Sequence, residues 1–404
     1  MLIASIAALL AACGGGQNTG SASPAAAAAT APTLLASASK VDPAADPVSA
    51  PAAMSTALAT TYNLYVSASS GSDSAAGTAT APLRTIQRAA NLAKPSTTIH
   101  VGPGTYAESI SSTVNGTASA RIRFVSDQKW KAIIKPVGSA YSMWQVRGGY
   151  TDIDGFQVDG NGSTTVRLGI YLNGGNSSVQ NSWVHHVAMN SGCDNRGGAG
   201  IVADQGRGAS YNNYDFIGNV VHNVGGGCGY IQGLYHSSNG KIINNVVYAT
   251  STGINMGHDD HDILVMNNTV FGNGGYGVYY GGCKEAYNHG CPTSGIQVHN
   301  NIIYNNRGGI SGPVTAEDVG NNVSKNLIYA NSNNFDLASP SKSTATGIIS
   351  SDPLFVSYIS GGGGDYHLRS NSPVVNKGLL TNAPLYDIEG KLRGSSMDMG
   401  AYEY

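Results

Sequence analysis

Two short motifs alternate along the chain from Tyr150 onward, and this repeat constrains the fold more than any other feature. One is Asn, any residue, an apolar residue and an aromatic residue, found at Asn245–Tyr248, Asn268–Phe271, Asn301–Tyr304 and Asn326–Tyr329, with Asn219–His222 as a variant. The other is Gly followed by an apolar residue, beginning at Gly169, Gly200, Gly233, Gly253, Gly277 and Gly309, at spacings of 20 to 33 residues. A unit this short cannot bury its own apolar face, whereas stacked units can. The repeat predicts a solenoid of short strands, in which the Asn side chains bond from one coil to the next.

The composition agrees with a fold that is rich in turns. Only 11% of the residues are charged, and Gly accounts for 54 of 404. Gly and Asn favour turns with positive φ, so we expect an all-β fold with short strands and not a helical bundle. The formal net charge is -2 and no basic run is present. Electrostatics therefore gives no support for nucleic-acid binding.

The N-terminal region divides into two parts before the folded domain. Leu2–Ala12 is apolar but too short to span a bilayer as a helix, and it leads into Leu10-Ala11-Ala12-Cys13. Residues 1–13 resemble a bacterial lipoprotein signal, which implies export, a lipid on Cys13 and a location at the outer membrane or cell surface. The alternative is an ordinary hydrophobic export signal with an unmodified cysteine. Residues 14–60 are mostly Ala, Ser, Pro, Thr and Gly, typical of a flexible tether, so the folded domain is expected at 61–404.

Features at both ends of that domain accompany the repeat. An alternating strand at Tyr62–Ser67 is followed by a short amphipathic helix between Pro82 and Pro95 and by Val101–Tyr106. With the Asn repeats and the closing segments Asp387–Arg393 and Asp398–Glu403, these features resemble the pectate-lyase-like superfamily. The resemblance implies a monomeric, single-stranded right-handed parallel β-helix over residues 62–404, with the helix capping its N-terminal end.

Four cysteines remain if Cys13 carries lipid. An exported chain meets an oxidising compartment, where disulfides persist. Cys283 and Cys291 would close a short loop, and Cys193 and Cys228 would then pair across neighbouring coils. No CxxC spacing supports a zinc site instead.

Alternation along the Gly-apolar strands predicts which side chains point outward. The outward positions are Tyr171, Asn173, Val202, Asp204, Tyr235, Ser237, Asn255, Tyr279 and Ser311. The column just beyond the strands is Asn176, Arg207, Gly240 with Lys241, Asp260 and Lys284. Aromatic rings that stack on sugars, beside amides and charges, predict a groove for an elongated, hydroxyl-rich chain. We assign Tyr171, Asp204, Tyr235, Lys241, His258 and Tyr279 to substrate binding; the alternative is a solvated rim, which any β-helix has.

Carboxylates gather between two of these strands, at Asp259, Asp260 and Asp262. Several carboxylate oxygens suit Ca²⁺, a hard cation. The alternative is a polar turn in which the Asp side chains cap backbone N–H groups. The neighbouring His258 and His261 leave a transition metal open, since imidazole suits zinc, copper or iron.

The family resemblance implies a reaction for this region. Lyases of the superfamily cut uronic-acid polymers by β-elimination, in which a base removes the proton α to a carboxylate that a cation neutralises. The expected base is Lys284 and the cation is Ca²⁺ at the three Asp residues. Arg207, Arg196 and Lys241 are the candidates for binding a substrate carboxylate. One departure is that the preceding coil offers Tyr235-His236-Ser237 where such enzymes supply a further Asp.

A metal-free variant of the reaction is also open. His236 and Tyr280 fall on the inward column, three residues after Gly. If the register differs by one residue, both face the groove as a base and acid pair.

Three functions therefore compete for this fold. The first is a polysaccharide lyase acting on an acidic, uronic-acid-containing polysaccharide. The second is a glycoside hydrolase that uses Asp204 with Asp259 or Asp260. The third is a non-catalytic glycan-binding surface protein, since fold does not fix function.

Overall fold

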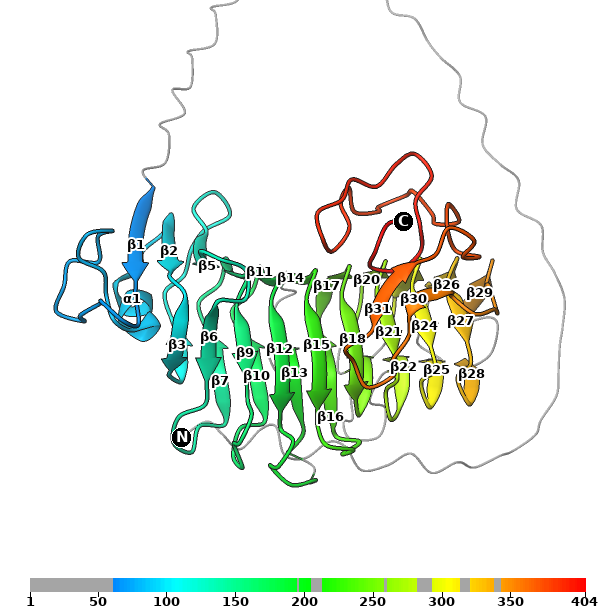
Figure 1. Ribbon diagram of the computed structural model, residues 1–404, viewed down its shortest axis with the longest axis horizontal. Coiled ribbons are helices and arrows are strands. Elements are labelled where there is room, and N and C mark those ends of the chain that lie inside the picture. The colour runs from blue at the N-terminus through cyan, green and yellow to red at the C-terminus, as the bar shows by residue number, and fades with distance from the viewer. Residues whose placement is uncertain are drawn as a thin grey trace, which may run out of the picture. The chain divides into compact units, whose positions relative to one another are not determined.

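The computed structural model describes residues 61–194, 196–204, 213–257, 260–281, 293–312, 320–337 and 343–404. These residues form three sheets of parallel strands, which the chain visits in turn as it winds in successive coils (Figure 1). The predicted all-β parallel β-helix is confirmed. Within the described part, no helix is long and apolar enough to cross a membrane.

We name the sheets in the order in which each coil visits them. Sheet A runs β1 (Tyr62–Val66), β2 (Thr97–Val101), β5 (Ile122–Ser126), β8 (Thr151–Asp154), β11 (Ser177–Gln180), β14 (Asn213–Ile217), β17 (Asn239–Ile243), β20 (Ile263–Met266), β23 (Gln297–His299), β26 (Asn321–Ser324), β29 (Ser343–Thr346). Sheet B runs β3 (Gly104–Ala107), β6 (Ala132–Lys135), β9 (Gln157–Asp159), β12 (Trp183–Val187), β15 (Val220–Val224), β18 (Val246–Thr250), β21 (Thr269–Phe271), β24 (Ile302–Tyr304), β27 (Leu327–Tyr329). Sheet C runs β4 (Ile110–Ser112), β7 (Ser142–Val146), β10 (Leu168–Leu172), β13 (Gly198–Asp204), β16 (Ile231–Ser237), β19 (Thr252–Met256), β22 (Tyr276–Tyr280), β25 (Gly308–Gly312), β28 (Asn333–Leu337).

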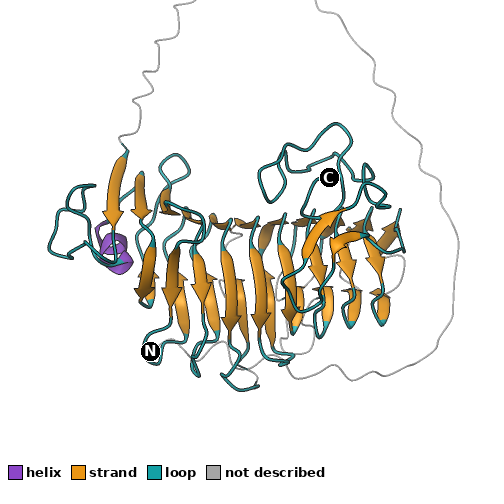
Figure 2. Ribbon diagram, in the orientation of Figure 1, coloured by secondary structure: helices purple, strands orange, loops and turns teal. Residues whose placement is uncertain are grey.

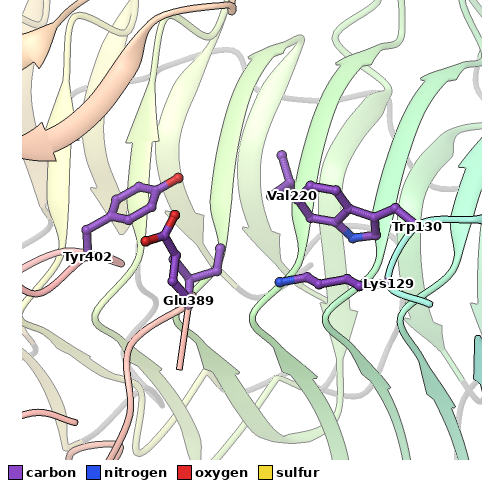
Figure 3. Close-up of a pocket in the computed structure, with 6 residues that line it drawn as sticks. Lys129, Trp130, Val220, Glu389 and Tyr402 are labelled. Atoms are coloured by element: carbon purple, nitrogen blue, oxygen red, sulfur yellow. The ribbon is translucent and has the colours of Figure 1, made fainter. Parts of the chain in front are cut away.

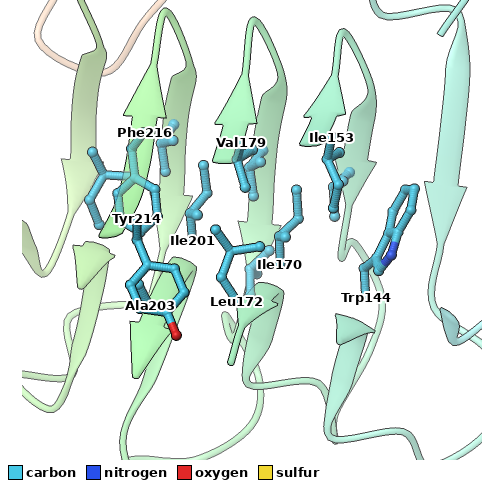
Figure 4. Packing of buried hydrophobic residues seen from close by; sticks show 14 of the residues in the cluster. Trp144, Ile153, Ile170, Leu172, Val179, Ile201, Ala203, Tyr214 and Phe216 are labelled. Carbon is cyan, nitrogen blue, oxygen red and sulfur yellow. The ribbon is translucent and has the colours of Figure 1, made fainter. Parts of the chain in front are cut away.

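The core consists of apolar columns that run along the inside of the coils. In sheet A, Ile153, Val179 and Phe216 are aligned on neighbouring strands and fully buried. Ile170 and Ile201 form the matching column of sheet C, so the two sheets face each other through side chains (Figure 4). Burying one such side chain stabilises the fold by about 1.5–3 kcal/mol. The alternation that fills the core also fixes which residues face outward.

A ladder of buried asparagines joins the coils at the turn from sheet A to sheet B, as the repeat predicted. The Asn268 Nδ2 donates to the Ile242 carbonyl at 2.8 Å and to the Asn301 Oδ1 at 2.9 Å. Its own Oδ1 accepts from the backbone N–H of Asn245 at 2.8 Å. Asn219 and Asn326 extend the same ladder in both directions. Each side chain thus satisfies backbone groups of its neighbours that would otherwise be buried without a partner.

A second asparagine ladder, which the two sequence motifs did not predict, lies between sheets B and C. The Asn273 Nδ2 donates to the Asn306 Oδ1 at 2.8 Å, and Asn306 donates to Asn331 at 3.0 Å. These residues lie five positions after Asn268, Asn301 and Asn326. The coil is therefore pinned on both sides of sheet B.

One helix, α1 (Ile86–Leu92), stands beside the first strands, as predicted (Figure 2). The Thr85 side chain caps it by accepting from the backbone N–H of Arg88. Its inner face buries Ile86, Ala89 and Ala90. Farther along the chain, the Cys193–Cys228 disulfide is present, which confirms that pairing; Cys283 and Cys291 lie outside the described residues.

The C-terminal segment after sheet A folds back over part of sheet B. It contains the antiparallel pair β30 (Phe355–Ser357) and β31 (Asp365–Leu368). Its apolar residues form one cluster with the outer side chains of β18, β21, β24 and β27, namely Val246, Tyr248, Phe271, Ile302 and Leu327. The buried Arg393 secures it by an ion pair with Glu403 at 2.9 Å and a hydrogen bond to Asn244 at 3.0 Å. The outer faces of β9 and β12 are not part of this cluster.

We predict that Asn268→Ala lowers the free energy of unfolding by more than about 3 kcal/mol, because it leaves several buried polar groups unpaired at about 1–3 kcal/mol each. Asn322→Ala is the matched control, since this half-buried Asn lies on the outer face of sheet A, and it should change stability by less than about 0.5 kcal/mol. Denaturant unfolding of both variants measures the difference. Equal effects would mean that the ladder contributes no more than a surface amide.

Candidate functional site

The outer face of sheet C carries one side chain per strand in a register-aligned column. Backbone pairing places these residues side by side in the order Ser111, Gln145, Tyr171, Val202, Tyr235, Asn255, Tyr279, Ser311 and Asp336. Their sequence neighbours, such as Ile170 and Leu172, are fully buried, so the column points away from the core. The outward positions predicted from the Gly-apolar motif are confirmed.

Tyrosine recurs on every second strand in the middle of this column, from β10 to β22. Tyr171 lies on β10, Tyr235 on β16 and Tyr279 on β22, and all three are half-buried. Neighbouring strands are about 4.8 Å apart, so successive tyrosines are separated by roughly 9.6 Å along the solenoid. On the same face, a small cluster of apolar side chains surrounds Val202, and Tyr141, Tyr171 and Tyr235 pack against it. The result is a firm aromatic strip parallel to the solenoid axis.

Polar residues follow the strand ends beside this strip. The Arg147 Nη2 donates to the Gln145 Oε1 at 2.9 Å and is exposed. The Ser237 Oγ donates to the Asp204 Oδ1 at 3.1 Å. Burial, and secondarily the negative charge of Asp204, raises the pKa of the Tyr171 hydroxyl well above its usual value. Tyr171 therefore keeps its proton and can donate a hydrogen bond at neutral pH.

A further polar group marks the C-terminal end of the column. The Tyr276 hydroxyl donates to the Asp336 Oδ2 at 3.0 Å, and the Ser311 Oγ donates to the same oxygen at 3.2 Å. Sequence reasoning missed Asp336, Gln145 and Arg147, because β28 and β7 lack the Gly-apolar motif. The spacing of the neighbouring coils is the signal that could have located them.

The described carboxylates of the acidic stretch point in different directions. Asp260 is fully buried, and its Oδ1 accepts from the Thr293 hydroxyl at 2.9 Å. Asp262 is exposed, in a left-handed turn with φ 48°. Neither belongs, among the described residues, to a group of three ligand side chains close enough to hold a metal ion. Asp259 and His258 lie outside the described residues.

Of the cationic side chains predicted for the site, the structure describes Lys241 and Arg196 but not Lys284 or Arg207. Lys241 is on the outer face of sheet A, paired in register with Asp215, and not on sheet C. The reason is loop length: β16 ends at Ser237 and β17 begins at Asn239, so this coil has almost no loop in which Lys241 could reach the groove.

His236 and Tyr280 point into the solenoid, where the alternation placed them. Both are 0% exposed, and a ring nitrogen of His236 lies 3.1 Å from the Tyr214 carbonyl oxygen. This position argues against an acid and base pair formed by these residues, because a substrate on the outer face contacts neither ring. Burial lowers the pKa of His236 to about 4, so the imidazole is neutral at pH 7.

A pocket of about 270 Å³ lies on the other side of the molecule, next to sheet B. Lys129, Trp130 and Val220 line one wall, and Ile388, Glu389 and Tyr402 of the C-terminal segment line the other (Figure 3). Its two walls are far apart in the sequence, so no local motif could have indicated it.

Comparison with known proteins supplies a family and a fold. The family model described as "Protein of unknown function (DUF1565)" matches residues 69–352. The solved structure of pectate lyase Pel9A is similar with a TM-score of 0.51 and 17% identity, covering 86% of this chain and 97% of the lyase.

Two further solved structures are less similar. An alginate lyase from Paenibacillus sp. str. FPU-7 has a TM-score of 0.38 and 17% identity, covering 66% of this chain and 92% of that chain. A GH136 lacto-N-biosidase from Eubacterium ramulus has a TM-score of 0.41 and 12% identity, covering 72% of this chain and 67% of that chain. No curated protein matches the sequence. At these identities, what the chain shares with the pectate lyase is the β-helix fold.

We predict that wild-type protein loses stability as the pH falls from about 6.5 to 4. The pKa of His236 is about 4 in the folded state but about 6.5 in an unfolded chain, so the unfolded state binds more protons in this window. His236→Met should show a smaller loss, because Met256 fills the paired position of the next coil and does not titrate. Thermal unfolding at both pH values measures this. An unchanged pH dependence in the variant would contradict it.

Proposed function

This chain belongs to the DUF1565 family, whose description assigns no function, and we propose that it acts on an elongated acidic polysaccharide bound along the outer face of sheet C. The observation that carries the proposal is the recurrence of tyrosine on every second strand from β10 to β22 in one aligned column. A spacing of roughly 9.6 Å is close to the length of a disaccharide unit. A regular glycan can therefore place equivalent rings on Tyr171, Tyr235 and Tyr279.

The polar residues of the column suit the rest of such a ligand. Gln145 and Asn255, both half-buried, offer donors and acceptors to sugar hydroxyls on strands that carry no tyrosine in this column. Arg147 adds an exposed guanidinium, which binds carboxylates in a bidentate manner. An aromatic strip with hydroxyl-binding groups and a cation favours a polymer of uronic acids over a neutral glycan.

The proposed reaction is β-elimination. Lys284 removes the proton α to the uronate carboxylate, the C–H electron pair forms the new double bond, and the glycosidic C–O bond breaks, so that its oxygen leaves with the departing chain. Arg207 pairs with the carboxylate and stabilises the enolate-like charge that develops on it. In the sequence, Arg207 follows Asp204 at the end of β13, and Lys284 follows Tyr280 at the end of β22.

We also propose that Asp259, Asp260 and Asp262 bind calcium, but no step of the reaction above depends on this ion. Asp260 is buried against Thr293, so its Oδ1 is already engaged. Chelation of the protein before an activity assay tests the requirement for a bound cation. The lipid on Cys13 is likewise proposed, and the mass of the mature N-terminal peptide tests it.

The hydrolase alternative is less well supported by the same geometry. A glycosidase of this kind needs two carboxyl groups that both reach the substrate. Asp204 is half-buried at the end of β13; of its two candidate partners, Asp260 is 0% exposed and Asp259 lies outside the described residues. An elimination does not need this pair.

We predict that incubation with uronic-acid polymers produces unsaturated chain ends, measured by their ultraviolet absorbance. Lys284→Ala should lower that rate by about 10²-fold or more, as expected for loss of a general base. Lys241→Ala is the matched control and should keep wild-type activity, because Lys241 lies on sheet A.

Other products would contradict the elimination. New reducing ends without ultraviolet absorbance indicate hydrolysis. Retention of polymer on the protein without any cleavage indicates a binding protein. Full activity of Lys284→Ala would exclude Lys284 as the base.

We predict that Tyr235→Ala and Tyr279→Ala each weaken binding of a uronic-acid oligosaccharide by about three- to tenfold, the equivalent of one aromatic contact. Tyr386→Ala, which removes an exposed tyrosine from the C-terminal segment, should leave the affinity unchanged. Calorimetric titration of the three variants measures this. Equal affinities in all of them would place the glycan elsewhere on the molecule.

A further inference from the structure

The outer face of sheet B presents two adjacent histidines to one carboxylate. Asp159 at the end of β9 is paired in register with His185 on β12, and both side chains point outward. The two residues are separated by one coil, so the fold and not the local sequence brings them together. The outer face of sheet B differs from that of sheet C in its side chains. The part that the C-terminal segment does not cover carries imidazoles in place of tyrosines.

The backbone at His186 brings the second imidazole to the same side. Strict alternation would turn His186 inward, but its φ of 54° is in the left-handed region. Asn223 and Ala249, at the matching positions of the next coils, have φ of 51° and 49°. His and Asn tolerate this conformation better than most residues. The left-handed conformation of this residue within β12 therefore places His186 beside His185 and not in the core.

The three donor atoms have the separations of a single metal site. The His185 Nδ1 lies 2.7 Å from the His186 Nδ1 and 3.5 Å from the Asp159 Oδ1, and the His186 Nδ1 lies 4.0 Å from that oxygen. A triangle with these sides is acute and has a circumscribed radius of about 2.0 Å, so one point inside it is equidistant from all three atoms. Imidazole and carboxylate ligands bind Zn²⁺ at about 2.0–2.2 Å.

The remaining polar atoms of the three side chains are held by neighbours, as in metal sites. The Gln157 amide is 2.9 Å from the His185 Nε2, and the Asn223 amide is 3.2 Å from the His186 Nε2. An amide can present either its NH₂ or its oxygen to a ring nitrogen. It thus accommodates the tautomer that protonates Nε2 and leaves the Nδ1 lone pair free. Lys135 pairs with the Asp159 Oδ2, and Oδ1 accepts from the backbone N–H of Asn161 at 3.0 Å while a second lone pair is turned toward the imidazoles.

We propose that Asp159, His185 and His186 bind one divalent transition-metal ion on the outer face of sheet B. Two imidazoles and a carboxylate suit Zn²⁺, Cu²⁺, Ni²⁺ or Fe²⁺ better than Ca²⁺ or Mg²⁺, which prefer oxygen ligands. Three protein ligands leave positions for water or for a ligand oxygen. This site is independent of the function proposed for sheet C.

The surroundings leave one side of the site accessible. The Asp159 and His185 side chains are 11% and 6% exposed, whereas His186 is 36% exposed. Trp183 packs on His185 with a ring separation of 4.5 Å and on Trp130 at 5.6 Å. Trp130 in turn lines the 270 Å³ pocket beside the C-terminal segment. The aromatic rings thus cover the site on the side of His185, and His186 borders its accessible side.

The test is metal binding by the full chain, without an affinity tag that contains histidine. The protein is treated with a chelator, dialysed and titrated with zinc chloride, and bound zinc is counted by elemental analysis. His186→Ala removes one ligand, and Asp159→Asn removes the charge of another. The backbone of His186→Ala should not be strained, since Ala249 and Ala330 occupy the matching position of other coils with φ of 49° and 57°. Thermal unfolding without metal checks that both variants fold.

The control is His367→Ala. His367 also lies between two carboxylates, Asp365 at 2.7 Å and Glu389 at 3.1 Å, but they contact different ring nitrogens and cannot share one ion with it. We expect wild type and His367→Ala to bind zinc equally, and His186→Ala and Asp159→Asn to bind it at least about tenfold more weakly. The proposal is overturned if wild type takes up no zinc, or if both ligand variants bind it as tightly as wild type. The group is then a metal-free hydrogen-bonded network.

Discussion

The hydrogen-bonded register between successive coils is the constraint on which the rest of the structure depends. Buried amides of Asn245, Asn268 and Asn301 fix each coil relative to the next, because every one of them satisfies backbone groups of its neighbours. A slip of one residue would turn each outward side chain inward and leave these groups unpaired. The same register that protects the core thus aligns side chains of distant segments on the outer faces.

The two outer faces use this alignment for different chemistry. Sheet C repeats tyrosine at two-strand intervals, which suits a long, regular ligand that contacts many coils. Sheet B concentrates His185, His186, His222, Asp159 and Trp183 on a few coils, with Trp130 beside them, and the C-terminal segment covers another part of that sheet. A long binding face on one side and a compact site on the other are compatible, since a solenoid has separate faces that need not share residues.

Much of this could be predicted from the sequence where the repeat is regular. The Asn and Gly-apolar motifs predicted a solenoid of short strands, and the family resemblance implied the parallel β-helix. The motifs also predicted the outward tyrosines and the inward positions of His236 and Tyr280, because period-two alternation decides which way a side chain points. Asp336 and Arg147 were missed because their strands, β28 and β7, lack the motif. Lys241 was assigned to the wrong sheet because the loop before β17 is much shorter than the loop before β20.

Contacts between distant segments could not be found in the same way. The pocket needs the C-terminal segment to fold back on Trp130, and nothing in the repeat indicates where that segment lands. Asp159 and His185 are 26 residues apart, which is within the range of one coil. That spacing would have suggested their contact only if the left-handed turn at His186 had also been known.

The most direct test of the central claim is a crystal structure of the protein with a bound uronic-acid oligosaccharide. We expect the sugar chain to lie parallel to the solenoid axis over Tyr171, Tyr235 and Tyr279, with one disaccharide unit for every two strands of sheet C. A chain bound across the strands, or in the pocket lined by Trp130 and Tyr402, would contradict the assignment of sheet C as the substrate-binding face.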